Sequence, residues 1–220
     1  PTTKTIITQQ RINAQYKNLA EINFNDVNSH LPWEQISYGY VYDSDPLNTT
    51  EFKRGASQGI FPFYGEYTVL SGVNKDWARA EAHGRTGKSL YVDGTMEPGL
   101  VATISTNAVI CSGQTMYCSA WFCNPAPAGW SGEGNPIFRC NIQGRKKLPG
   151  GTYSEWEDAG VYFVGELLKG SGWNQIVFPV KAASGYDETR VSIYNFATTN
   201  QGNDFMVDDI TLFVSQLPIA

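Results

Sequence analysis

The sequence is poor in the residues that bind nucleic acid, hold metals through sulfur or cross a membrane. Only 17% of its 220 residues are charged, and the net charge of −5 is spread along the chain without blocks of like charge. Such a chain does not attract a nucleic-acid backbone, which argues against nucleic acid as a partner. No apolar run approaches the roughly 18–20 residues that span a bilayer, so no transmembrane segment is predicted.

A secretory signal is also missing. The chain opens "PTTKTIITQQ", without a methionine and without the basic and then apolar run of an export signal. We interpret it as a processed chain or an excised piece from which any export signal has been removed.

Cysteine is scarce, and its spacing does not fit a metal site. The cysteines are Cys111, Cys118, Cys123 and Cys140, with no C-x-x-C pair and no Cys/His set of the kind that zinc requires. In a period-2 pattern, Cys118 and Cys140 each share a strand face with apolar neighbours. We therefore expect both to be buried; a free thiol and a disulfide remain alternatives, and the redox compartment stays open.

Helical periodicity is absent as well. No 12-residue stretch carries a convincing 3.6-residue stripe, whereas almost every clear segment alternates with period 2 between turn-forming residues. This pattern predicts an all-β fold, a two-sheet antiparallel jelly-roll β-sandwich of about nine strands. The expected strands are Glu66–Ser71, Ser89–Asp93, Leu100–Thr106, Thr115–Asn124, Pro136–Gln143, Val161–Glu166, Trp173–Val180, Arg190–Phe196 and Phe205–Val214.

The N-terminal part of the sequence is less regular. It contains a possible strand at Ile22–Phe24 and the polar, turn-rich run "SDPLNTTEFKRGASQG". With no internal repeat and no strong linker, we predict a single domain over residues 1–220. Its core spans about 65–214, and residues 1–64 form an irregular N-terminal extension packed on it.

The stretch "AHGRTGKSLYVDG" resembles a relaxed nucleotide-binding P-loop at Gly87, Lys88 and Ser89. A P-loop needs a buried strand before its glycine-rich turn and a helix after it. Here Tyr91 and Val92 favour a strand after Ser89, and the residues that follow leave no room for a helix. The motif is therefore interpreted as a polar turn that leads into a strand.

Catalytic motifs are also few. Two histidines, His30 and His83, and no Gly-x-Ser-x-Gly motif argue against a Ser/His/Asp hydrolase. In "SEWEDAG", Glu155 and Glu157 are two residues apart, which is similar to the paired carboxylates of glycoside hydrolysis. The Glu-x-Asp-x-x-Glu motif of sandwich-fold glucanases fails at positions 157 and 160, so a solvated acidic loop is the favoured interpretation.

Aromatic residues occur where a core is not expected. Trp130 lies in "PAPAGWSGEGNP", and Tyr153 and Trp156 lie in "TYSEWED", among turn-formers and charges. The flat apolar face of a sugar stacks on an indole, so loop aromatics on a β-sandwich suggest saccharide binding. Packing of these rings against the core is the alternative.

Four segments in order carry a resemblance to a known family: "GKSLYVDGT", "PGLVATIST", "CSGQTMYCSAWFCN" and "NDFMVDDITLF". Together they resemble the galactose-binding-like jelly rolls found as carbohydrate-binding modules and as domains of bacterial surface proteins. The resemblance implies a non-catalytic module with a structural calcium ion, bound by a first-strand acid, backbone carbonyls and a closing-strand aspartate. By this resemblance Asp208 is the closing-strand ligand, with Asp209 the alternative, while Asn25 occupies the region where the family places its acid.

These observations support three hypotheses about function. The first is a non-catalytic, secreted or cell-surface carbohydrate-binding module that binds a glycan through Trp130, Tyr153 and Trp156. The second is an adhesion or spacer domain that contacts other surface proteins. The third is a sandwich-fold glycoside hydrolase that uses Glu155 or Glu157.

Overall fold

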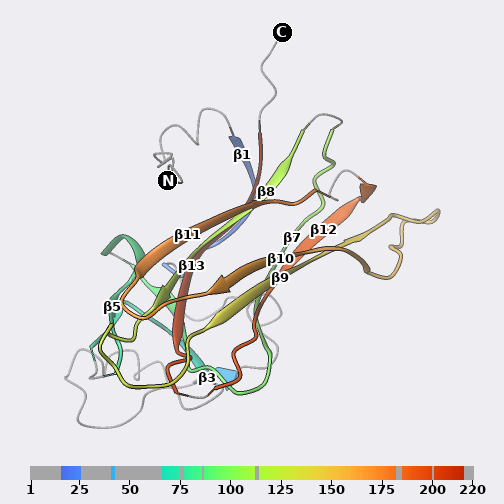
Figure 1. The fold of residues 1–220 in the computed structure, drawn as a ribbon. Coiled ribbons are helices and arrows are strands. Elements are labelled where there is room, and N and C mark those ends of the chain that lie inside the picture. The colour runs from blue at the N-terminus through green and yellow to red at the C-terminus, as the bar shows by residue number, and fades with distance from the viewer. Residues whose placement is uncertain are drawn as a thin grey trace, which may run out of the picture.

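The strands lie in two facing sheets (Figure 1). The computed structural model describes residues 16–25, 41–42, 66–74, 77–85, 87–111, 114–181, 185–199 and 201–215. Within these ranges the only helical element is a 3₁₀ turn at His83–Arg85, so the all-β prediction is confirmed. The strands are β1 (Tyr16–Ile22), β2 (Val41–Tyr42), β3 (Glu66–Leu70), β4 (Gly72–Asn74), β5 (Arg79–Glu81), β6 (Ser89–Val92), β7 (Gly99–Thr106), β8 (Met116–Asn124), β9 (Ile137–Arg145), β10 (Glu157–Glu166), β11 (Gly172–Pro179), β12 (Glu188–Asn195) and β13 (Phe205–Ser215).

The larger sheet has seven strands in the order β11-β8-β13-β6-β3-β2, with β1 paired to β13. The smaller sheet has four strands in the order β10-β9-β12-β7. Every pair in both sheets is antiparallel except the short β2–β3 pair. The strands β4 and β5 form a separate hairpin. The predicted two-sheet sandwich is confirmed, and all nine strands expected from the sequence are present.

The core lies between the two sheets and is rich in aromatic contacts. The ring of Phe138 on β9 lies 4.5 Å from that of Phe122 on β8 and 5.0 Å from that of Phe205 on β13. Cys118 and Cys140 are fully buried in the same cluster as free thiols, as their strand faces predicted. In strands such as β9, alternation therefore places one face inward and leaves the other partly exposed.

The first strand corrects one part of the sequence analysis. Residues 16–22, assigned there to the irregular extension, form β1 and pair with the closing strand from Tyr16 opposite Ser215 to Ile22 opposite Ile210. The register shifts between Asn18 and Ala20. Because such a bulge moves the side chains that follow it to the other face, period-2 alternation is broken and the strand is hidden in the sequence. Most of the remaining extension lies outside the described residues.

The closing strand carries a second bulge. The pairing of β13 with β8 is interrupted between Asp208 and Thr211. Asp209 lies within this interruption at φ 46°, the only non-glycine residue with positive φ among the described residues. A strand residue normally points away from the face of its predecessor, so this backbone conformation changes where the Asp209 carboxylate lies.

The P-loop-like stretch has the structure that its context predicted. Ser89 is the first residue of β6, and all four residues of that strand are buried.

Among the described residues, no helix is long and apolar enough to cross a membrane.

Candidate functional site

The solvent face of the smaller sheet carries a row of flat polar and aromatic side chains. Phe138, Cys140 and Ile142 of β9 are buried, so the residues between them face outward. Residues of β10 and β12 opposite these positions face the same way. We call this surface the arginine–aromatic face; it comprises Arg139, Asn141, Gln143, Arg145, Tyr153, Trp156, Phe163, Arg190, Tyr194 and Phe196.

Trp156 forms the centre of one end of this face. Its ring centroid lies 4.1 Å from the guanidinium carbon of Arg190 and 4.5 Å from that of Arg145. Tyr153 contacts the same Arg145 guanidinium, with 4.4 Å between the ring centroid and the guanidinium carbon. Both arginines come from neighbouring positions on one sheet face, so the half-buried indole lies over that face. Cation–π contacts of this kind hold an aromatic ring in place.

The arginines are themselves held by hydrogen bonds. Arg145 donates to Glu188 at 2.6–2.7 Å in an ion pair. Arg190 donates from Nε to Oε1 of Gln143 at 2.8 Å, and Gln143 donates from Nε2 to Asp158 at 2.8 Å. The sheet thus fixes both guanidiniums under the indole before any ligand arrives.

A second aromatic group lies toward the other end of the face. The guanidinium carbon of Arg139 is 4.2 Å from the ring centroid of Phe196, and its Nε donates to Asn141 at 3.0 Å. Phe163, which pairs with Arg139 across the strands, is 73% exposed. From position 139 to position 145 an extended strand covers about 20 Å. The face therefore has two separated aromatic groups, which we call the Trp156 station and the Phe163–Phe196 station.

Trp130 lies away from this face. Its ring is 5.5 Å from the ammonium nitrogen of Lys169, which donates a hydrogen bond to the carbonyl of Gly132. A side chain at Gly132 would collide with the Trp130 ring, so the indole packs against its own loop. Trp130 precedes β9 and Trp156 follows it, and a strand of this length separates its ends by roughly 27 Å. The structure brings Tyr153 and Trp156 together but does not bring Trp130 to them.

The acidic pair considered for hydrolysis lies beside the face. Glu155 and Glu157 are both exposed, and Glu157 accepts a 3.4 Å hydrogen bond from the hydroxyl of Tyr186. Neither carboxyl has a charge partner that would tune it as an acid or a base among the contacts of the described residues. The hydrolase hypothesis gains no support from this geometry.

The side chains implied as calcium ligands have protein partners. Asp208 is only 2% exposed, although it lies opposite Trp121 on the outer face of the larger sheet. Its Oδ2 accepts from the Ser89 hydroxyl at 2.9 Å, and its Oδ1 accepts from the amide of Asp209 at 2.8 Å. The Oδ1 of Asn25 accepts from the amide of Lys88 at 2.9 Å. The calcium set that the resemblance implies stays a prediction.

An imidazole lies next to the aspartates instead. His83 Nδ1 is 2.9 Å from Oδ2 of Asp209, and its ring stacks on Trp121 with 4.2 Å between centroids. Burial raises the pKa of Asp208 to about 6, and the neighbouring charge of Asp209 acts in the same direction. Burial likewise raises the pKa of Asp204 to about 6, against the hydrogen bond that it accepts from Tyr91 at 2.8 Å.

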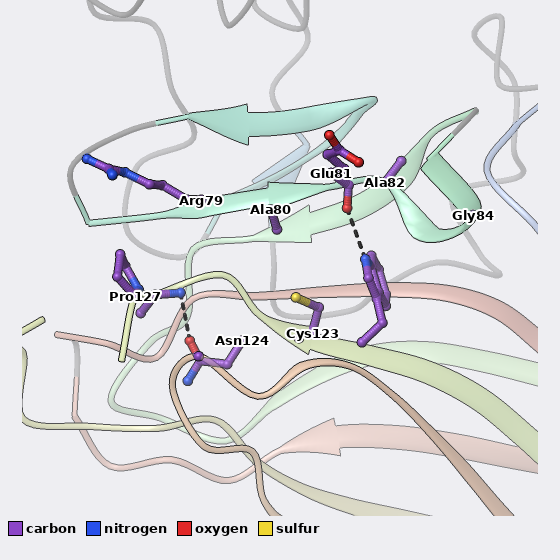
Figure 2. A pocket seen from close by; sticks show the side chains of 12 residues that line it. Arg79, Ala80, Glu81, Ala82, Gly84, Cys123, Asn124 and Pro127 are labelled. Carbon is purple, nitrogen blue, oxygen red and sulfur yellow. Dashed lines mark hydrogen bonds between the residues drawn. The ribbon is translucent and has the colours of Figure 1, made fainter. Parts of the chain in front are cut away.

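A cavity of about 580 Å³ lies between the β4–β5 hairpin and the end of β8. Figure 2 shows the side chains that line it. The indole N–H of Trp173 donates to the carbonyl of Glu81 at 2.9 Å at its edge. The amide of Asn124 is committed to protein partners: it donates to Asn135 and to the carbonyl of Leu167, and it accepts from Ala126. Alanines, glycines and a proline supply much of the remaining lining. The arginine–aromatic face is therefore the better candidate site.

The arginines of the site were not predicted from the sequence. Along "FRCNIQGR", apolar or small residues alternate with flat polar ones, and this alternation marks an outer strand face rich in hydrogen-bonding groups. No local signal joins His83, Trp121 and Asp209, which come from distant segments.

No protein-family model and no curated protein sequence matches the chain. Among solved structures, it is similar to the Stig cyclase Fisc from Fischerella sp. TAU in complex with (3Z)-3-(1-methyl-2-pyrrolidinylidene)-3H-indole. That match has 10% identity, a TM-score of 0.54, and coverage of 90% of this chain and 98% of that chain. At this identity the match shows a shared fold and no more.

Carbohydrate-binding modules recur among the similar structures. One is the CBM22-1 xylan-binding domain of Paenibacillus barcinonensis Xyn10C, with 10% identity, a TM-score of 0.36, and coverage of 70% of this chain and 88% of that chain. Another contains the CBM22-1 and GH10 modules of Clostridium thermocellum xylanase 10B with xylohexaose, at 16% identity, a TM-score of 0.40, and coverage of 70% of this chain and 27% of that chain.

Proposed function

We propose that the chain is a non-catalytic, secreted or cell-surface carbohydrate-binding module that holds a polysaccharide along the arginine–aromatic face. The observation that carries this proposal is the Trp156 indole, held over the sheet by the guanidiniums of Arg145 and Arg190 at 4.5 and 4.1 Å. An indole fixed in this way offers an apolar ring face to a sugar without losing much side-chain entropy on binding.

The polar side chains of the face suit the hydroxyl groups of a sugar. Asn141 and Gln143 have amide groups that donate and accept, and the arginines donate several N–H groups from one plane. They lie at alternate positions of β9 and are held by bonds to one another and to Asp158. Preformed donors of this kind fix the orientation of a ligand, while the aromatic rings supply most of the buried apolar area.

The length of the face favours a chain of sugars over a terminal sugar. The Trp156 station and the Phe163–Phe196 station lie about 20 Å apart along β9, a distance that several linked rings would cover. Each station has an aromatic ring and an arginine. We therefore expect affinity to rise with the number of linked sugars until both stations are occupied.

A protein-adhesion role is the second candidate, and one observation favours it. On β10, Val161 and Phe163 are 50% and 73% exposed, and both face the same side as Arg139 and Asn141. Exposed apolar side chains on an edge strand also suit a protein contact.

A glycan array followed by calorimetric titration tests the proposal. With a polysaccharide fragment selected on the array, Trp156→Ala should weaken binding at least tenfold. Trp130→Ala is the matched control, because that indole packs on its own loop, and it should change the affinity less than twofold. Equal losses in both variants would favour the sequence prediction that both tryptophans bind. An array on which no glycan binds would favour adhesion, and a Trp156→Ala protein with unchanged affinity would place the glycan site outside the arginine–aromatic face.

A further inference from the structure

On the outside of the larger sheet, an imidazole and two carboxylates converge from separate parts of the chain. The ligand atoms of His83, Asp208 and Asp209 all lie within 4.8 Å of one another. His83 comes from the turn after β5, and both aspartates come from the bulge in β13. Consecutive strand residues normally point to opposite faces. Here the positive φ of Asp209 turns its carboxylate toward the side on which Asp208 and His83 lie.

Neighbouring groups hold each of these side chains. The His83 ring stacks on Trp121 with an interplanar angle of 28° and lies 5.4 Å from the ring of Trp173. The Ser89 hydroxyl donates to Oδ2 of Asp208, and the Asp209 amide donates to its Oδ1. Outer groups of this kind orient ligands in metal sites and fix their donor atoms.

The spacing of the donor atoms suits a small divalent ion. A tetrahedral ion with bonds of about 2.0–2.2 Å keeps its ligands roughly 3.3–3.6 Å apart. The 2.9 Å between His83 Nδ1 and Asp209 Oδ2, and the 4.8 Å limit on the whole set, lie on either side of this value. Small side-chain rotations bring the three atoms to that spacing, and water fills the remaining position.

We propose that His83, Asp208 and Asp209 form a binding site for a divalent ion that accepts nitrogen ligands, with zinc as the representative ion. An imidazole with carboxylates is a ligand set for zinc and its neighbours, whereas calcium is held by oxygen ligands alone. The site is thus distinct in chemistry from the calcium set that the resemblance implies, and it is independent of glycan binding on the opposite sheet.

Metal binding replaces a hydrogen bond. Without metal, Nδ1 of His83 and Oδ2 of Asp209 share a hydrogen bond at 2.9 Å. With metal, the Nδ1 lone pair binds the ion and the neutral imidazole keeps its one proton on Nε2. The alternative is that His83 and Asp209 only contact each other and hold no ion. The two alternatives differ in whether zinc binds at this place.

The test uses the full chain, without an affinity tag, after treatment with a chelator that is then removed. All proteins carry Cys111→Ser, because this exposed thiol would otherwise bind zinc. Calorimetric titration should show one zinc ion bound per chain. Zinc should also raise the unfolding midpoint, and calcium at the same concentration should show no saturable binding.

Two variants locate the ion. Asp209→Asn keeps the shape and the left-handed backbone, which asparagine adopts readily, and removes the charge. His83→Gln removes the imidazole. Each should weaken zinc binding at least tenfold, while Glu97→Gln, a change at an exposed carboxylate, should leave it unchanged. Copper or nickel should quench the fluorescence of Trp121 and Trp173, whose rings lie 4.2 and 5.4 Å from the ligand ring, and Trp121→Phe should reduce this quenching while binding persists.

Absence of saturable zinc binding in the parent protein would overturn the proposal. Zinc binding that is equally tight in His83→Gln and Asp209→Asn would overturn it as well, because the ion would then lie elsewhere. Saturable calcium binding that Asp208→Asn abolishes, without zinc binding, would favour the ligand set implied by the resemblance.

Discussion

The guanidinium carbon of Arg190 lies 4.1 Å from the ring centroid of Trp156, and the same guanidinium donates to Gln143 on the neighbouring strand. A loop residue is thereby fixed over regular sheet structure. The orientation of the indole depends on β9 and β12 as much as on its own loop. If the face binds a glycan as proposed, changes beneath the ring should weaken that binding through the orientation of the indole.

Replacement of the guanidinium tests this relationship. Arg190→Met retains a long side chain but removes the cation–π contact and the bond to Gln143. We expect glycan affinity to fall three- to tenfold because the indole loses its fixed orientation, while the free energy of unfolding changes by less than about 1 kcal/mol. Calorimetric titration and urea denaturation measure the two quantities. An unchanged affinity would show that Trp156 is positioned by its loop alone.

The side chain of Asn195, near the end of the smaller sheet, is predicted to stabilise the folded protein. It is 1% exposed, accepts from the amides of Ile137 and Ala197, and donates to Asn203 at 2.6 Å. Asn195→Ala leaves two backbone donors without their acceptor and should lower the free energy of unfolding by about 2–4 kcal/mol. Asn195→Asp keeps the acceptor but sets a buried carboxylate oxygen against Oδ1 of Asn203, so it too should destabilise the protein. A loss below about 1 kcal/mol for Asn195→Ala in urea denaturation would contradict this account.

Asp204 should make the protein more stable in mild acid. Burial raises its pKa from 3.8 to about 6, so between these values the folded state binds a proton that the unfolded state does not. The contribution of Asp204 to the free energy of unfolding therefore increases as pH falls from about 6.5 to 4, by up to about 3 kcal/mol. The difference in unfolding free energy between the parent protein and Asp204→Asn, measured across this range, isolates the effect. A difference that does not vary with pH would show that the pKa of Asp204 is not raised by folding.

The cysteines should separate into one reactive and three protected thiols. Cys111 is exposed, whereas Cys118, Cys123 and Cys140 are buried. Burial raises the pKa of Cys123 and of Cys140 to about 12, which also removes the reactive thiolate at neutral pH. Mass spectrometry after brief alkylation should find one label in the native protein and four after unfolding. Rapid labelling of Cys118 or Cys140 in the native protein would show that these side chains do not face the core.

Strict alternation made most strands predictable. In β9 the buried residues Phe138, Cys140 and Ile142 occupy every second position, as the period-2 pattern requires. The same rule failed for β1, where the shift between Asn18 and Ala20 changes the facing of the residues that follow. A bulge depends on the partner strand, so it leaves no reliable mark in a single sequence.

The candidate site was predictable only in part. Turn-formers and charges around Tyr153 and Trp156 identified both as loop aromatics, and the structure places them together on Arg145. Trp130 has similar neighbours in sequence but packs on its own loop and beside Lys169. The difference depends on contacts between distant segments. Local composition does not encode these contacts, and for the same reason it did not join His83 to Asp209.

The position of β13 has a consequence for the order of events in folding. This strand pairs with β8 along one edge and with β6 and β1 along the other, and its last residue lies opposite Tyr16. Contacts between such distant residues slow folding, because a long loop must close before they stabilise anything. A nascent chain that has not yet released residues 205–215 from the ribosome leaves β1, β6 and β8 without their shared neighbour. We expect such intermediates to depend on chaperones and to aggregate when these are scarce.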